Sequence, residues 1–427
     1  MKKQLLAGVL SATMVMASIS TTAIAVDATE EATNLLPEST ILSEQEVPEN
    51  ESMEQPAEIE SIPASEIQEI AETEKAADGV VEVDSADALK KAVENAEDGV
   101  ETTIQLKNDV ILSKAMTVNE DQIIILDLNK HEITVASDFS TRIFTNYGNL
   151  TIQGNGTVDV TNAGANGYGT VNNFGTLTVV DGTYKNMEES DASNFYNRNG
   201  GTATFIEPTI YGGGGCVATQ ADTTTTIEGG YYENNTYPTI ENRGNMLITG
   251  GEFANTSCSA CNGRNKYGYT VRSGESSENA YLKIQGETED SVKVTGVQGG
   301  LAVIGGTADI YNGSYKTTPC KIHGGNNAFY AGYFTGESYK TATTIYGGTF
   351  ESCSKNAVQV GNGNPAPDSG AGEESTVMIK DGTFIGGDAA NTAIIVEDME
   401  NAIGAANITG GTFSSNVKDF IDPSTDW

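Results

Sequence analysis

The chain has 427 residues, of which 59 are Asp or Glu and 23 are Lys or Arg, so its formal net charge is −36. This charge argues strongly against nucleic acid and anionic lipid as partners, because long-range repulsion opposes their approach to an acidic surface. We expect no cofactor, apart from calcium that such carboxylates could bind loosely.

The N-terminal residues have the pattern of a secretory signal. Residues 1–25 begin with Lys2 and Lys3, continue as an apolar run and end in the small residues of a cleavage site. The run is too short for a stable membrane span, and no later apolar stretch reaches the ~18 residues that a span needs. We therefore expect a secreted bacterial protein that does not insert into a membrane after the signal is removed.

Residues 26–79 form an acidic segment with little to fold around. Positions 27–78 contain 16 Asp or Glu residues, one basic residue (Lys75) and no aromatic residue. A segment of this composition repels itself and cannot bury a core. We predict an extended, disordered spacer.

A helix is predicted next, over residues 85–98, with Ser85 as its N-cap and Gly99 after its end. Its apolar stripe consists of Ala88, Leu89, Ala92, Val93 and Ala96. Strands are predicted at Thr103–Leu106, Val110–Leu112 and Ile123–Leu128. A repeat structure needs a cap over the apolar end of its core, and a short helix of this kind can provide it.

One six-residue phrase then recurs seven times: apolar, any residue, Asp/Asn/Gly, Gly, any residue, Phe/Tyr. The copies begin at Val179, Ile227, Ile248, Ile310, Ile345, Ile379 and Ile408. The third and fourth positions hold residues that tolerate positive φ, which predicts a sharp corner. Alternating apolar residues before the corner predict a strand with one buried face. The aromatic residue after the corner is predicted to point inward, so that successive copies stack their rings.

The spacing of the copies determines the architecture. The corner glycines are 21 to 62 residues apart, and the longest gaps are predicted to contain degenerate coils at Phe205–Ile210 and Leu282–Gly286. A β-propeller blade needs four strands in ~40–45 residues, which a 21-residue unit cannot hold. We therefore predict an all-β fold over residues 80–422, a right-handed, single-stranded parallel β-helix of about eleven to thirteen coils. Residues 423–427 are predicted to be a tail.

A second corner precedes the strand of several copies. It reads Asn-aromatic-Gly at Asn146–Gly148 and Asn173–Gly175, and Asn-Arg-Gly at Asn242–Gly244. Asn tolerates the left-handed conformation and bonds well at corners. We expect these Asn side chains to stack as an amide ladder with a structural role.

Two stretches resemble a known family. Ile125–Thr134 reads Ile-Leu-Asp-Leu-Asn-Lys-His-Glu-Ile-Thr and resembles the first-coil phrase of pectin-lyase-like β-helix proteins on the surface of Gram-positive gut bacteria. Gly410–Phe420 is similar to the phrase that closes the same domain. The chain departs from the family at Lys130, where the pattern has Gly. The resemblance implies an adhesin-like surface protein, although some related β-helices cleave polysaccharides.

Candidate catalytic groups are few. Glycoside hydrolysis needs paired carboxylates, and the resemblance brings in lyases that use acids for calcium and an Arg or Lys as base. Asp181 and Asp381 stand at corners where Gly serves equally well in other copies. His131 and His323 are isolated. We predict no catalytic residue from the sequence.

Two further groups of residues have binding chemistry. Arg198 and Arg243 each follow an Asn at the same corner, so they can form a basic strip that would bind an anionic sugar. Cys258 and Cys261 have the spacing of a metal or redox pair, but zinc would need two more ligands. A local disulfide or buried free thiols explain these cysteines equally well, and no βαβ pattern supports a redox role.

Protruding loops are the remaining candidates for contact. Residues 262–280 and 362–372 are long insertions, and loops on a rigid scaffold commonly bind partners. The sequence favours a non-enzymatic secreted or cell-surface protein, adhesin-like or structural, that contacts glycans or a host or cell-wall surface through these loops. The alternatives are a polysaccharide lyase or glycoside hydrolase, and a carbohydrate-binding module that uses exposed Tyr267 and Tyr269.

Overall fold

The computed structural model describes residues 79–164, 168–188, 190–255, 268–275, 277, 279–297, 299–319, 327–332, 340–361, 375–387, 392–396, 398–399 and 402–424. The predicted signal segment and the predicted spacer up to residue 78 lie outside the described residues. The same is true of Cys258, Cys261 and the insertion 362–372.

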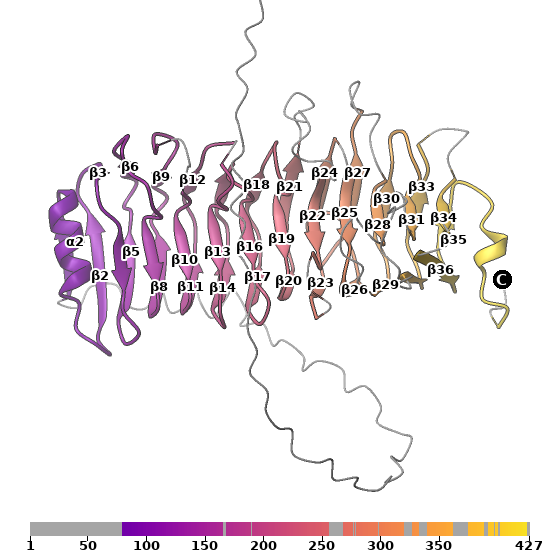
Figure 1. Cartoon of the computed structure of the whole chain (residues 1–427), viewed down its shortest axis with the longest axis horizontal. Helices are drawn as coiled ribbons and strands as arrows, with labels where there is room; N and C mark the ends of the chain where they lie inside the picture. The colour runs from indigo at the N-terminus through magenta and orange to yellow at the C-terminus, as the bar shows by residue number, and fades with distance from the viewer. Residues whose placement is uncertain are drawn as a thin grey trace, which may run out of the picture. The chain divides into compact units, whose positions relative to one another are not determined.

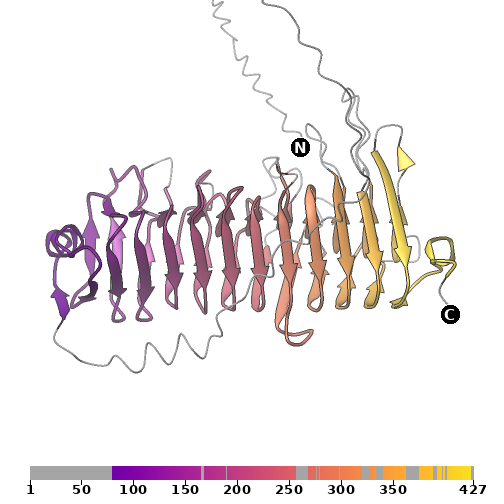
Figure 2. The same ribbon diagram turned by 90° about the horizontal axis from the view of Figure 1, so that it is seen from below.

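The described strands form three sheets of 14, 12 and 11 strands (Figures 1 and 2). The 14-stranded sheet contains β1 (Val80–Val83), β2 (Glu101–Leu106), β5 (Ile123–Asp127), β8 (Asn149–Gln153), β11 (Thr176–Val179), β14 (Thr202–Phe205), β17 (Thr224–Ile227), β20 (Asn245–Ile248), β23 (Tyr281–Ile284), β26 (Gly306–Ile310), β29 (Thr341–Ile345), β32 (Ser375–Ile379), β36 (Ala402–Ile408) and β35 (Asp398–Met399). The 12-stranded sheet contains β3 (Val110–Leu112), β6 (Glu132–Val135), β9 (Thr157–Asp159), β12 (Thr183–Lys185), β15 (Thr209–Tyr211), β18 (Tyr231–Glu233), β21 (Gly251–Asn255), β24 (Val292–Gly296), β27 (Ser314–Thr317), β30 (Thr349–Glu351), β33 (Thr383–Ile385) and β37 (Thr412–Phe413). The 11-stranded sheet contains β4 (Met116–Val118), β7 (Phe144–Asn146), β10 (Val171–Asn173), β13 (Phe195–Asn197), β16 (Val217–Thr219), β19 (Ile240–Asn242), β22 (Tyr269–Ser273), β25 (Gly299–Val303), β28 (Phe329–Ala331), β31 (Val358–Val360) and β34 (Ile394–Val396).

Most coils contribute one strand to each sheet, and most strands pair in parallel with the strand three further along the chain, as β8 does with β11 and β11 with β14. At the two ends of the stack the step differs: β1 pairs in parallel with β2, β32 with β36 and β33 with β37. Figure 2 shows the resulting row of coils, from α2 at the indigo end to β36 at the yellow end. The short β35 is an exception, because it pairs antiparallel with β36. The predicted parallel β-helix is confirmed, including the degenerate coils that contain β14–β15 and β23. Its right-handedness stays a prediction.

The core consists of the side chains that alternate inward along each strand. The predicted inward aromatic residues of the first six copies are completely buried: Tyr184, Tyr232, Phe253, Tyr315, Phe350 and Phe384. In the last coils they stack as predicted. Ring centroids are 4.6 Å apart for Tyr315 and Phe350, 5.1 Å for Phe350 and Phe384, and 5.0 Å for Phe384 and Phe413.

The corners of the coils need residues that can adopt positive φ, and the repeat places glycine there. The fourth-position glycines of all seven copies have positive φ: Gly182, Gly230, Gly251, Gly313, Gly348, Gly382 and Gly411. At the first coil, where the resembled family has Gly, Lys130 itself adopts φ 66° and its amide donates to the Gly154 carbonyl at 2.7 Å. The corner is therefore kept in spite of the departure from the family pattern.

The predicted amide ladder lies between the 11-stranded and 14-stranded sheets. Asn146 Nδ2 donates to Asn173 Oδ1 at 2.7 Å, and Asn173 Nδ2 donates to Asn197 Oδ1 at 2.8 Å. In the next coil Thr219 and Thr225 take over, with their hydroxyl oxygens 2.7 Å apart. The prediction that Asn242 belongs to the amide ladder is wrong, because its Nδ2 donates to the Ser273 hydroxyl at 3.0 Å and to the Tyr281 carbonyl at 2.9 Å. Each ladder side chain points inward, so the residues directly before and after it in the sequence lie on the outer surface. The candidate site lies on this surface.

The helix is shorter than the sequence predicts. α2 spans Ala86–Glu94, with the predicted cap Ser85 accepting from the Ala88 amide at 3.3 Å. The prediction that it continues to residue 98 is wrong, because the residues after Glu94 pair with the coil instead of continuing the helix. Gln122 Nε2 donates to the carbonyls of Val93 and Ala96, and Asp98 forms a β-bridge with Gln122. α2 covers the first coil, as expected for a cap, and the 3-10 helix η1 (Lys418–Phe420) lies beyond β37.

Candidate functional site

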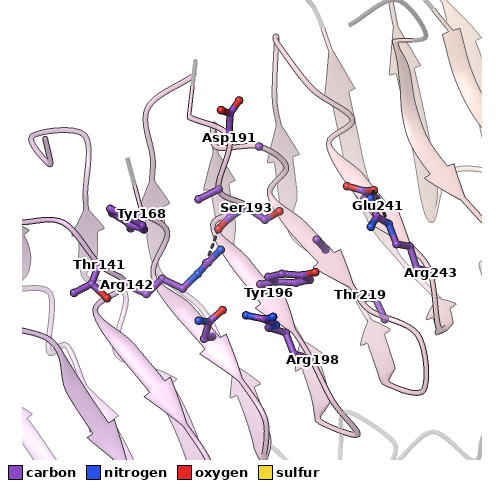
Figure 3. A pocket seen from close by; sticks show the side chains of 14 residues that line it. Thr141, Arg142, Tyr168, Asp191, Ser193, Tyr196, Arg198, Thr219, Glu241 and Arg243 are labelled. Carbon is purple, nitrogen blue, oxygen red and sulfur yellow. Dashed lines mark hydrogen bonds and ion pairs between the residues drawn. The ribbon is translucent and has the colours of Figure 1, made fainter. Parts of the chain in front are cut away.

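A groove of about 480 Å³ lies on the outer face of the 11-stranded sheet, across the coils that contain β7 to β19 (Figure 3). Along each strand the middle residue points outward, because its two neighbours point into the core. Tyr196 of β13, Ala218 of β16 and Glu241 of β19 occupy this position in successive coils. The small Ala218 side chain lies between two large ones, so the sheet surface is hollowed there.

One end of the groove is formed by a buried arginine. Arg142 precedes β7 and is 7% exposed. Its Nη1 donates to the main-chain carbonyls of Val171 at 3.2 Å, Ser193 at 2.5 Å and Asn194 at 3.1 Å. Burial, together with the positive charge of Arg198, lowers the pKa of Arg142 to about 10. The guanidinium is therefore held rigidly by neutral main-chain groups, and no carboxylate of the described residues forms an ion pair with it.

Arg198, the residue after the ladder Asn197, supplies a second cation. Its Cζ lies 4.8 Å from the ring centroid of Tyr196 and 5.5 Å from that of Phe174, while the Arg142 Cζ lies 5.8 Å from the Tyr196 centroid. Two guanidinium groups therefore share one aromatic ring (Figure 3). The Nε of Arg198 is buried without a hydrogen-bond partner. Among the described residues, neither arginine forms a salt bridge.

The other end of the groove is electrically balanced. Glu241 Oε1 accepts from Arg243 Nε at 3.0 Å, from Arg243 Nη2 at 2.5 Å and from Arg272 Nη2 at 3.3 Å. Glu275 Oε2 accepts from Arg243 at 3.1 Å and from Arg272 at 2.5 Å. Two carboxylates and two guanidinium groups therefore form a closed quartet, which we call the ion-pair quartet.

The arrangement is suited to binding an anion. Two adjacent guanidinium groups repel each other, and a carboxylate, sulfate or phosphate group placed between them would remove that repulsion with charge-assisted hydrogen bonds. Asn172 Oδ1 lines the same groove and is buried without a donor. It can accept a hydrogen bond from a hydroxyl group of the same ligand.

Acid–base chemistry has less support in the groove. Its two carboxylates are Asp191 and Glu241. Burial alone would raise the pKa of Glu241, but Arg272 and Arg243 outweigh it and hold that pKa low. Glu241 is thus kept ionised and cannot serve as a proton donor. Asp191 Oδ1 accepts a hydrogen bond from the Tyr237 hydroxyl at 2.5 Å.

The prediction that Arg198 and Arg243 lie on one face is confirmed, since both line this groove. The sequence analysis missed Arg142, Tyr196 and Glu241. Tyr196 and Glu241 each stand directly before the corner Asn of their coil, Asn197 and Asn242, and that position alternates outward, so the repeat contained a usable signal for them. Arg142 belongs to no repeated phrase and had no such signal.

The other sequence candidates have structural roles. Asp181 Oδ1 accepts from the Asn155 amide, and Asp381 Oδ1 accepts from the Gly382 amide, each at 2.8 Å. His131 Nδ1 lies 3.2 Å from Asp109 Oδ1. Cys216, a cysteine outside the predicted Cys258–Cys261 pair, is completely buried, which raises the pKa of its thiol. Within the described ranges, no three His, Cys, Asp or Glu side chains are grouped so that they could hold a metal ion.

The prediction of an exposed Tyr269 is wrong. Tyr269 is 3% exposed and packs on Tyr330, with ring centroids 5.7 Å apart. The two rings belong to β22 and β28, with β25 between these strands, and they form a small apolar cluster with Ala302 and Ile304 that covers Tyr269. Tyr267 and His323 lie outside the described residues, as do residues 262–267 of the first predicted loop.

Comparison of the chain with protein-family models, curated proteins and solved structures gave no match. Neither helix in the described part of the chain has the length and apolar character needed to cross a membrane.

Proposed function

We propose that this protein is a secreted, non-enzymatic β-helix protein of adhesin-like function, and that it binds acidic polysaccharide in the groove on its 11-stranded sheet. The observation that supports this proposal is the pair Arg142 and Arg198, two cations over one ring that form no ion pair with any carboxylate in the described part of the chain. The chain has a net charge of −36, so acidic side chains that could pair with these arginines are abundant. Because the two cations are nevertheless not balanced, we infer that their partner is an external anion.

Sugar polymers fit the groove better than other anions. The groove is open along several coils and combines the cations with the side-chain amide of Asn172, which can bond sugar hydroxyls. Repulsion from the acidic surface is limited to short range, because the Debye length is only about 8 Å at physiological ionic strength. A segment of polyanion a few sugars long can therefore bind locally.

The test is binding of polygalacturonate and heparin by the full chain, with neutral dextran as a reference, measured by calorimetry. The variant Arg198→Ala removes one of the two cations and is expected to weaken binding by tenfold or more, since a charged hydrogen bond contributes ~1.5–3 kcal/mol. Arg198→Lys keeps the charge but loses the planar donor fork, so we expect an intermediate loss.

Lys380→Ala is the matched control. Lys380 Nζ lies 4.7 Å from the Tyr346 ring centroid beside the 14-stranded sheet, so its removal also deletes one charge and one cation–π contact. Binding should be unchanged in this variant. Equal loss in both variants, or equal binding of dextran and polygalacturonate, would show that the groove is not the binding site.

A polysaccharide lyase is the second candidate, and the lowered pKa of Arg142 is the observation that favours it. To act as the base of a lyase, Arg142 would have to lose its proton. Three carbonyls accept hydrogen bonds from Arg142 Nη1, and these bonds favour the protonated guanidinium. We therefore expect no unsaturated product when the protein is incubated with polygalacturonate and calcium. Appearance of that product, and its loss in Arg142→Lys, would replace the binding proposal with the enzyme.

A further inference from the structure

The ion-pair quartet extends the groove in the direction of the coil axis. Arg198 and Arg243 occupy the same place in their coils, directly after Asn197 and Asn242. Their strands, β13 and β19, are two steps apart in the 11-stranded sheet, which corresponds to about 9–10 Å. The side chain of Arg243 is 37% exposed and lines the groove, whereas the side chain of Arg272 is only 12% exposed.

The charge of the quartet depends on one carboxylate. With Glu241 and Glu275 both ionised, the two arginines are balanced. If Glu275 becomes neutral, Glu241 alone faces two guanidinium groups, and the quartet has a net charge of +1. The Nε of Arg272 is buried without a partner, so the quartet already contains more donors than its carboxylates satisfy.

We propose that the quartet is a second anion subsite, which accepts another negative group of the same polysaccharide when Glu275 takes up a proton. This inference rests on the proposed function. It specifies the ligand as a linear polyanion that lies along the coil axis, with one anionic group at Arg142 and Arg198 and a second about two coils away at Arg243.

The electrostatics identify Glu275 as the group that takes up the proton. Burial, and then the hydrogen bond shared with Glu241, raise the pKa of Glu275 to about 6, although Arg272 and Arg243 oppose the rise. Among the described residues, these three side chains, from β19, β22 and the corner after β19, are the charged groups that face Glu275. The next coil places the apolar Ala302 beside Arg272.

The protonation of Glu275 determines the direction in which binding depends on pH. Glu275 is mostly neutral below pH 6, so the quartet is cationic there and the second subsite is available. Above pH 6 Glu275 must take up a proton before the second anionic group can bind. The cost of this protonation makes the affinity for the polyanion about tenfold lower at pH 7 than at pH 5. Carboxyl groups of the ligand, with a pKa of about 3.5, stay ionised over this range.

The experiment compares galacturonic acid with tetragalacturonate, by calorimetry at pH 5 and pH 7. The single sugar reaches only Arg142 and Arg198, so its affinity should be the same at both values. Tetragalacturonate should bind about tenfold more weakly at pH 7, and titrations in buffers of different ionisation heat should show uptake of close to one proton at that pH.

Glu275→Gln should bind tetragalacturonate at pH 7 as tightly as the wild type does at pH 5, and should show no proton uptake. The control Glu351→Gln removes an ion-paired carboxylate on another sheet, 3.1 Å from Lys316, and should behave as wild type. If tetragalacturonate binds equally at both pH values and Glu275→Gln changes nothing, the second subsite is wrong while the proposed function stands. If Arg198→Ala also leaves binding intact, or the wild type binds neither probe, both are wrong.

Discussion

At the scale of single residues, one inward side chain per coil determines how well the core is filled. Phe350 is completely buried between Tyr315 and Phe384, with nearly parallel rings, and Phe329 meets it edge-on at 6.0 Å. The recurring Asp-Gly and aromatic positions could have been read as a sugar-binding motif. Their burial assigns them to the core and the corner instead.

Phe350→Ala should therefore lower the free energy of unfolding by ~3–5 kcal/mol, because it removes a large buried ring and leaves a cavity that its stacked neighbours cannot close. Chemical denaturation measures the change. Ile111→Ala is the control, since Ile111 is 69% exposed on the same sheet and its loss should cost no more than ~0.5 kcal/mol. A neutral Phe350→Ala would contradict the observed packing of the ring.

At the scale of elements, the amide ladder connects successive coils. The side chain of Asn173 accepts from Asn146 and donates to Asn197 and to the carbonyls of Gly175 and Thr202. The three-residue phrases predicted this ladder, because Asn at a repeated corner has few other uses. They did not predict that Thr219 and Thr225 replace the amide in one coil, since no copy of the phrase is present there.

Asn173→Ala should destabilise the protein by ~2–3 kcal/mol, because it leaves buried amide groups of the neighbouring coils without partners. The neighbouring Asn172 is a matched control: it points outward, its Oδ1 has no partner, and Asn172→Ala should change stability by at most ~0.5 kcal/mol. Thermal and chemical denaturation of both variants test this. Similar values for the two would mean that the ladder contributes little.

At the scale of the whole molecule, the strands of each coil pair with those of the neighbouring coils, so stability is largely a sum along the stack, and the end is protected by α2. The sequence predicted this cap from the apolar stripe of the helix. It could not predict where the helix ends, because the pairing of Gln122 with Val93 and Ala96 joins residues far apart in the chain.

Leu89→Ala should open the stack from one end. Leu89 is completely buried under α2, and the truncation creates a cavity between the helix and the first coil. Hydrogen exchange followed by mass spectrometry should show faster exchange in β2 to β6 and unchanged exchange in β29 to β33, because openings spread only between neighbours. A uniform increase over all coils would show that the stack opens as one unit.

The sequence by itself determined the coil. Corner glycines, alternating apolar residues and ladder asparagines act locally, through allowed φ values and the pleat of a strand, so they can be read in any copy. Only the tertiary structure decided the site. The connections between strands vary in length, so the spacing in the sequence does not show which residues become neighbours. The parallel pairing of the strands brings Arg142 beside Arg198, and Arg243 beside Arg272 and Glu275. The charge balance at each end of the groove follows from these contacts, and charge balance is a property of neighbours in space.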